Sequence, residues 1–190
     1  MFGTYYYNKG QYTLAESYFN QNLIIREELS DKVGLPSAYN NMGNIRMVQG
    51  DYKKAIEYHL LSLKIKEELK DEKGIAMSYN NIANAYRMFK QPKKAIEYHK
   101  LSLGIKEKLG DKRATAYSLA NIANAYFENG QKNEALAYYN KALKLQHELN
   151  DELQLGNTYN SIGYVALKDQ QYIKAAENFQ KSLQYNLKTN

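Results

Sequence analysis

The sequence predicts an all-α protein, a right-handed superhelical solenoid built from antiparallel helix pairs. The first observation is a period of 40 residues that aligns acidic, small and apolar positions along the whole chain. The second is that each period holds two stretches with the apolar spacing of a helix face. The third is a glycine between those stretches in three of the periods. The aligned positions are Asp31, Asp71, Asp111 and Asp151, then Ala15, Ala55, Ala95, Ala135 and Ala175, then Leu23, Leu63, Leu103, Leu143 and Leu183.

Each period is expected to form a helical hairpin. One helix presents Tyr39, Met42, Gly43 and Arg46 at the spacing i, i+3, i+4 and i+7, and the next presents Tyr52, Ala55, Ile56, His59 and Leu63. The chain is therefore interpreted as one array over 1–190. Its repeats are a truncated first unit at 1–30 and then 31–70, 71–110, 111–150 and 151–190.

The residues between the helices predict how each helix ends and begins. Gly10, Gly50 and Gly130 can adopt a left-handed conformation without steric cost, and Lys90 and Gln170 occupy the same place in other repeats. The four aligned aspartates are expected to cap first helices by accepting bonds from unpaired amides. Pro36 lies deeper in its segment, so the first helix of 31–70 is expected to begin later than its relatives.

Composition excludes several classes of protein. The chain has 44% apolar residues, which is enough for a packed core, and no cysteine, which excludes disulfides and thiolate zinc sites. It shows neither an apolar run of about 20 residues nor a signal-peptide pattern, so we expect no membrane partner and a cytoplasmic location.

The net charge of +6 does not by itself indicate a nucleic-acid partner. The lysines alternate with glutamates, and those expected to form a stripe on the second helices lack interleaved aromatic residues. We therefore expect no nucleic acid, and we interpret the stripe as a solvated face. Its members are Lys53, Lys54, Lys64, Lys66, Lys93, Lys94, Lys106 and Lys108.

No residue constellation indicates catalysis, a metal or another cofactor. His59 and His99 occupy a position that holds Phe19, Tyr139 and Phe179 in the other repeats, so it is interpreted as an aromatic packing slot. Two histidines without cysteine do not make a metal site of the usual kind. We expect the protein not to be an enzyme and to need no cofactor.

The motif carried by these positions resembles the tetratricopeptide repeat family. It appears as Leu119, Ile122-Ala123, Tyr126, Gly130, Ala135, Tyr139 and Ala142-Leu143, with leucine in place of the first aromatic residue. The long period and the segments YNNMGN and YNNIAN look like the subgroup of kinesin light chains, Leu-Gly-Asn-repeat adaptors and bacterial peptide-sensing regulators. The resemblance implies that asparagines on the first helices line a concave groove and hold the backbone of an extended peptide.

The residues themselves support a ligand-binding face. First helices carry asparagine opposite their core side, whereas second helices carry lysine and glutamate there, which are better helix formers. Because an amide both donates and accepts, a row of amides can pair with the main chain of a protein or peptide ligand. The predicted peptide-binding residues are Asn40, Asn41, Asn44, Asn80, Asn81, Asn84, Arg87, Met88, Asn121, Asn124, Phe127, Asn160 and Tyr164. The same face also includes Met47, Val48, Glu128, Asn157, Ser161 and Lys168.

Two other interpretations of the asparagines are hydrogen bonding between repeats and simple inheritance by duplication. At the level of function, the alternative is a scaffold or sensory segment of a larger bacterial signalling protein, without a peptide groove of its own.

The sequence also predicts an array that is open at both ends. Ala175, Ala176, Phe179 and Leu183 would then be partly bare. We expect either an excised piece of a larger protein or self-association through these ends.

Overall fold

A computed structural model describes residues 2–188, and within them every regular element is an α-helix, which confirms the all-α prediction. The chain divides into two compact units, Met1–Gln91 and Pro92–Asn190. The N-terminal unit holds α1 (Phe2–Asn8), α2 (Tyr12–Glu28), α3 (Leu35–Val48), α4 (Tyr52–Glu68) and α5 (Glu72–Met88). The C-terminal unit holds α6 (Pro92–Lys108), α7 (Lys112–Glu128), α8 (Lys132–Glu148), α9 (Glu152–Lys168) and α10 (Tyr172–Leu187).

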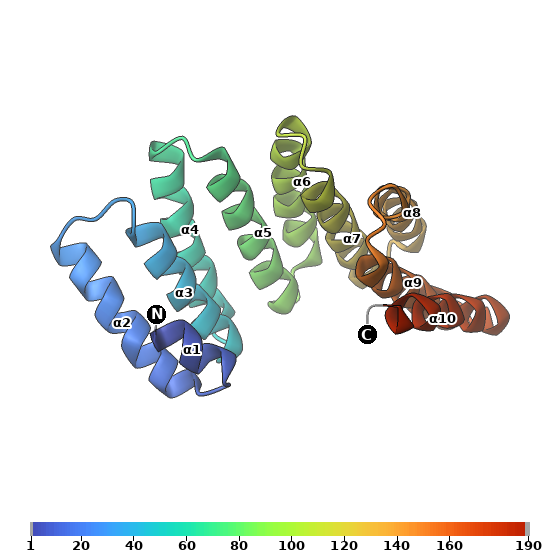
Figure 1. The fold of residues 1–190 in the computed structure, drawn as a ribbon, viewed down its shortest axis with the longest axis horizontal. Coiled ribbons are helices and arrows are strands. Elements are labelled where there is room, and N and C mark those ends of the chain that lie inside the picture. The colour runs from blue at the N-terminus through green and yellow to red at the C-terminus, as the bar shows by residue number, and fades with distance from the viewer. Residues whose placement is uncertain (1, 189–190) are drawn as a thin grey trace. The chain divides into compact units, whose positions relative to one another are not determined.

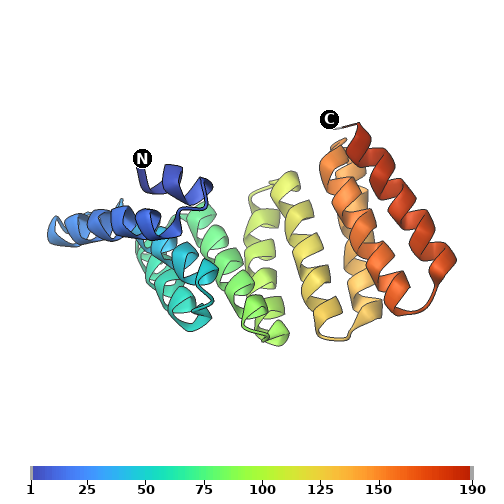
Figure 2. The same ribbon diagram turned by 90° about the horizontal axis from the view of Figure 1, so that it is seen from below.

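Within each unit, helices that follow one another in the chain lie side by side and run antiparallel. In the N-terminal unit α4 packs against both α3 and α5 (Figure 1). In the C-terminal unit α7 packs against α8, and α9 against α10, as the yellow to red helices of Figure 2 show. The expected helical hairpins are therefore confirmed.

The short turns between helices use left-handed residues at the expected places. Gly10, Gly50 and Gly130 have φ of 73°, 79° and 78°, and Lys90 and Gln170 adopt φ of 58° and 56°. A non-glycine residue in this region costs about 1 kcal/mol, which the packed helices on either side must offset. Turns that follow the second helices use the same conformation at Ser30, Lys70, Gly110 and Asn150.

Three of the four aligned aspartates cap first helices as expected. The carboxylates of Asp71 and Asp111 each accept a bond of 2.9 Å, from the amides of Gly74 and Ala114, and Asp151 does the same toward α9. An oxygen at this place satisfies an amide that has no partner inside the helix.

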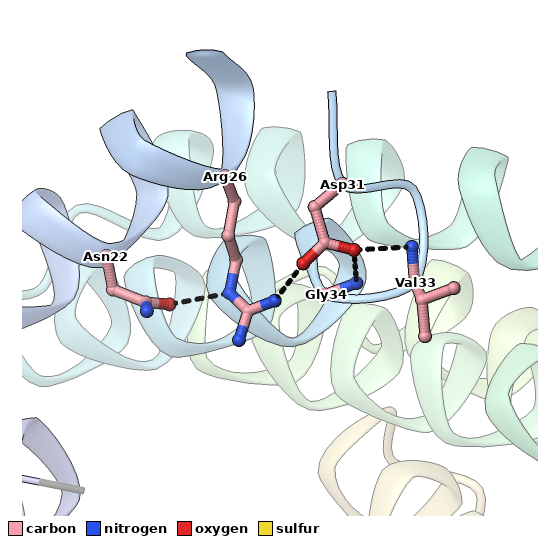
Figure 3. A network of polar contacts seen from close by, with 5 residues as sticks. All are labelled: Asn22, Arg26, Asp31, Val33 and Gly34. Carbon is pink, nitrogen blue, oxygen red and sulfur yellow. Dashed lines mark hydrogen bonds and ion pairs between the residues drawn. The ribbon is translucent and has the colours of Figure 1, made fainter. Parts of the chain in front are cut away.

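The helix α3 begins late, at Leu35, with Pro36 in its first turn, which confirms the expectation from Pro36. Asp31 instead shapes the turn before it by accepting bonds from the amides of Val33 and Gly34 (Figure 3). The backbone bond from Gly34 is the main reason why the pKa of Asp31 is lowered, and the nearby Arg26 guanidinium lowers it further.

The core of each unit is built around the repeated small residue of the second helix. Ala15, Ala55, Ala95, Ala135 and Ala175 are all no more than 2% exposed. Large apolar side chains of the first helices fill the space around them, and Ile45, which the expected core face did not include, is fully buried with Met42.

The predicted aromatic slot packs against a glycine or alanine of the first helix. A methyl group on Gly43 would lie 2.6 Å from the His59 ring, and one on Gly163 would lie 2.6 Å from Phe179. The slot also carries a polar contact that the sequence did not reveal, because His59 Nδ1 lies 3.1 Å from Asn40 Oδ1.

We expect Ala135→Leu to lower the free energy of unfolding by about 1–3 kcal/mol, because Ala135 is fully buried beside Ala123, Tyr139 and Val165. Ala137→Leu on the same helix is the matched control, since Ala137 is exposed. Urea denaturation of both variants measures the difference. An equal loss in the two variants would contradict this packing assignment.

The second prediction concerns pH. Burial, and then the nearby Lys66 charge, lower the pKa of His59 from 6.5 to about 4. Between these values the unfolded chain binds a proton that the folded chain does not, so stability falls as the pH drops from 6.5 toward 4, by up to about 3 kcal/mol.

His59→Phe should remove this part of the pH dependence, because phenylalanine already fills the slot opposite glycine at Phe19 and Phe179. Urea midpoints measured at several pH values for both proteins test it. Parallel pH profiles for the two proteins would show that His59 does not cause the loss.

Candidate ligand-binding face

The helices α7 and α9 bring polar, uncharged side chains together around a hollow of about 170 Å³. Residues spaced four and then three apart share one face of a helix, which places Tyr117, Asn121 and Asn124 in a row on α7. The hollow is lined by Tyr117, Ala120, Asn121, Asn124, Gln154, Asn157, Thr158 and Ser161. Two predicted residues, Asn121 and Asn124, therefore meet amides of the next repeat.

The core positions one of these amides. The Tyr139 hydroxyl, in the aromatic slot of α8, donates to Asn124 Oδ1 at 2.5 Å. Since Tyr139 is buried, the orientation of the Asn124 amide is fixed by packing rather than by solvent. On α9 the Ser161 hydroxyl donates back to the Asn157 carbonyl at 3.1 Å.

A second hollow of about 370 Å³ lies nearer the N-terminal ends of the same two helices. It is lined by Lys106, Asp111, Arg113, Ala114, Tyr117, Asp151 and Gln154. Tyr117 and Gln154 line both hollows, so the two adjoin, and we call them together the α7–α9 trough.

The N-terminal unit carries the same type of residue on α3 and α5. Asn41 lines a hollow of about 370 Å³ that includes Ser37, Ile25 and Arg26. The Arg26 guanidinium in this hollow is held by Asn22 and Asp31 (Figure 3). The remaining predicted amides of this unit are half-buried: Asn44, Asn80, Asn81 and Asn84.

Several predicted residues lie outside the hollows. The amide oxygen of Asn40 is engaged with His59, and Phe127 is half-buried against the core cluster around Tyr139, which gives both a structural role. Asn160 and Tyr164 are exposed on α9, and the Tyr164 ring packs edge-on against Phe179 at 5.4 Å. On α5, Arg87 is half-buried and Met88 is exposed.

Two residues that line both hollows, Tyr117 and Gln154, were not among the predicted site residues. The signal for Tyr117 was present, because it precedes Asn121 by four residues and therefore shares its helix face. Gln154 lies one turn before Thr158 near the start of α9. Whether it lines a hollow depends on how closely α7 approaches α9.

The placement of Lys66 and Lys106 in an outer basic stripe was wrong. Their position in the second helix faces the first helix of the following repeat. There Lys66 Nζ donates to Ser78 Oγ at 3.0 Å, and Lys106 Nζ to Ser118 Oγ at 2.7 Å. Burial lowers the pKa of both amines, and the caps Asp71 and Asp111 oppose part of that effect.

Residues 2–188 contain no group of three or more His, Cys, Asp or Glu side chains placed to hold a metal ion. None of the helices in that range is both long and apolar enough to cross a bilayer.

Solved structures that resemble this fold are repeat proteins. BtubC (BKLC) from P. vanneervenii has a TM-score of 0.84 and 22% identity, over 99% of this chain and 78% of that one. The kinesin light chain TPR-like repeats from Podosopora anserina have a TM-score of 0.82 and 19% identity, over 100% and 93%. A Rap protein complexed with competence and sporulation factor has a TM-score of 0.75 and 15% identity, over 98% of this chain and 62% of that one. No curated protein sequence matches the chain.

The sequence pattern of the tetratricopeptide repeat matches residues 34–108 and 112–188, which is most of the chain. The helix pairs, the buried alanines and the left-handed turns described above are the structural form of that pattern. The chain therefore belongs to the tetratricopeptide repeat family, and it is a protein–protein interaction module of that family.

Proposed function

We propose that this protein binds an extended segment of another protein, whose main chain lies in the α7–α9 trough. The observation that carries the proposal is that amide side chains from two successive first helices line the same hollow. On the second helices α4 and α6 the exposed positions carry lysine and glutamate instead, at Lys53, Lys54, Glu57, Lys93, Lys94 and Glu97.

The chemistry of the trough suits a main chain rather than one particular side chain. Each asparagine or glutamine offers an N–H donor and a C=O acceptor, as does each peptide unit of an extended ligand. The stretch of α7 from Arg113 to Asn124 is roughly 16 Å long at the helical rise of 1.5 Å per residue. An extended chain covers that length with about five residues.

The N-terminal unit is proposed to hold a segment in the same way. Asn41 and Asn44 on α3 and Asn81 and Asn84 on α5 repeat the spacing of Asn121 and Asn124. A single trough running through all of the repeats stays a prediction.

The complex of a Rap protein with competence and sporulation factor supports a binding role for this fold, because that protein contains a similar array of helices. The proposed binding mode rests on the side chains of this chain, not on that complex.

We expect Asn121→Ala combined with Asn157→Ala to weaken binding at least tenfold, which is about 1.4 kcal/mol. The probe is a library of random seven-residue peptides displayed on phage and selected on the immobilised protein. The affinity of the retained peptides is then measured by fluorescence anisotropy.

Asn133→Ala combined with Asn140→Ala is the matched control, because both asparagines are exposed on α8, away from the hollows. Circular dichroism verifies that both double variants remain folded. Retained peptides that bind both double variants equally well would remove the trough from the site. If the wild-type protein retains no peptide at all, the scaffold or sensory role becomes the better explanation.

Self-association is a second candidate, favoured by the exposed apolar face of α10. Leu183 is 58% exposed, whereas Leu63 and Leu103 at the same place in earlier repeats are almost buried. Ile173 and Leu187 are also exposed on this helix, so a second copy could cover the face.

If copies associate through this face, light scattering should give a mass that rises with concentration. Leu183→Lys combined with Leu187→Lys should abolish that rise, because a lysine placed in an apolar contact loses its hydration. A mass of 22.0 kDa at every concentration would contradict self-association.

A further inference from the structure

We infer that the hollow between the N-terminal ends of α7 and α9 seats one large apolar or aromatic side chain of the bound segment, with the Tyr117 ring as its wall. This inference rests on the proposed function, since the ligand is the segment held in the α7–α9 trough. It specifies one side chain that the bound segment must carry.

The charged groups around this hollow already have partners within the protein. Arg113 Nε lies 3.5 Å from Asp151 Oδ2, and Lys106 Nζ donates to Ser118 Oγ at 2.7 Å. Asp111 accepts the amide of Ala114 at 2.9 Å. Two cations stand against two carboxylates, so an acidic or a basic ligand side chain would find no excess of opposite charge.

Apolar surface is what the hollow leaves for a ligand. Tyr117 is 46% exposed, and Ala114 lines the hollow with it. A volume of about 370 Å³ falls within the range of pockets that accept small apolar groups.

The other tyrosines near the trough have their rings occupied. Tyr126 stacks on Tyr138 at 5.3 Å between ring centroids, and Tyr159 stacks on Tyr185 at 5.6 Å. Among the described residues Tyr117 makes no such ring contact, so one face of its ring remains available to a ligand. Aromatic pairs of this kind add about 0.5–1.5 kcal/mol beyond the burial of their area.

Three repeats vary the residue at this position while they keep the amide that follows it, whereas the repeat 151–190 has Asn157 and Ser161 at these two places. Ser37, Met77 and Tyr117 each precede an asparagine by four residues, at Asn41, Asn81 and Asn121. A constant amide beside a variable side chain fits a division of roles, in which the amide holds the main chain and the variable residue selects a side chain.

The test repeats the phage selection of random seven-residue peptides on the wild-type protein and on Tyr117→Ser. Peptides from the wild-type protein should be enriched several-fold in Trp, Tyr, Phe or Leu at one position. Replacing that residue by alanine should weaken binding at least tenfold, and Tyr117→Ser should weaken the parent peptide to a similar extent. Tyr172→Ser on α10 is the matched control, because Tyr172 is also exposed and lies outside the trough.

A spectroscopic measurement tests directly whether the ligand side chain lies in this hollow. The protein contains no tryptophan, so the emission of a tryptophan placed at the enriched position reports on the ligand alone. Its emission should shift to shorter wavelength on binding to the wild-type protein and to Tyr117→Phe, and this shift should be absent with Tyr117→Ser.

The outcomes separate this inference from the proposed function. The retained peptides can depend on Asn121 and Asn157 and yet show no preference for apolar residues, or a preference for acidic ones. Either result overturns the inference that the hollow holds an apolar side chain, and it leaves the peptide-binding function intact. Undiminished affinity for Tyr117→Ser also overturns that inference. If no peptide is retained by the wild-type protein, both proposals are overturned together.

Discussion

The whole structure depends on the close approach of two helices at one small residue in every repeat. A pair of helices cannot bury its apolar face alone, so each repeat relies on contact with its neighbours within the unit. The fully buried alanines of the second helices set the distance of that contact, and a larger side chain would push the helices apart. The glycines opposite the aromatic slot serve the same purpose, because Gly43 and Gly163 lie where any added methyl group would overlap the ring.

This constraint also determines which side chains can face a ligand. Once Ala123 and Ala135 have fixed the contact between α7 and α8, the helical period leaves Tyr117, Asn121 and Asn124 on the opposite side of α7. The same core then reaches out to that side, because the buried Tyr139 hydroxyl orients the Asn124 amide. Pre-orientation of this kind lowers the entropy that a binding site loses when it takes up its ligand.

Much of this arrangement could be predicted from the sequence, because it follows from local rules that the repeat displays several times. The left-handed turns at Lys90 and Gln170, the caps at Asp71 and Asp111 and the late start of α3 depend only on neighbours in the chain. The two hollows could not be predicted, since they depend on how far α9 lies from α7.

The contacts of Lys66 and Lys106, which occupy the same position in two second helices, could not be predicted for a related reason. A helical wheel does not distinguish a residue that faces solvent from one that faces the next repeat, and Lys66 and Lys106 face the next repeat. Gln146 occupies the position of Lys66 and Lys106 one repeat later. Its side-chain amide is fully buried, and the described residues offer it no hydrogen-bond partner.

The free energies of hydrogen bonding and of apolar burial favour an apolar contact beside an amide-lined face. An amide that bonds a peptide exchanges bonds to water for bonds to the ligand, so each bond contributes only about 0.5–1.5 kcal/mol. These bonds are also the same for every sequence, because the main chain is the same. Burial of one large apolar side chain contributes about 1.5–3 kcal/mol and does depend on the sequence of the ligand. In the proposed complex the amides therefore hold the main chain, and the hollow beside Tyr117 sets the register of the ligand and its preference for one sequence over another.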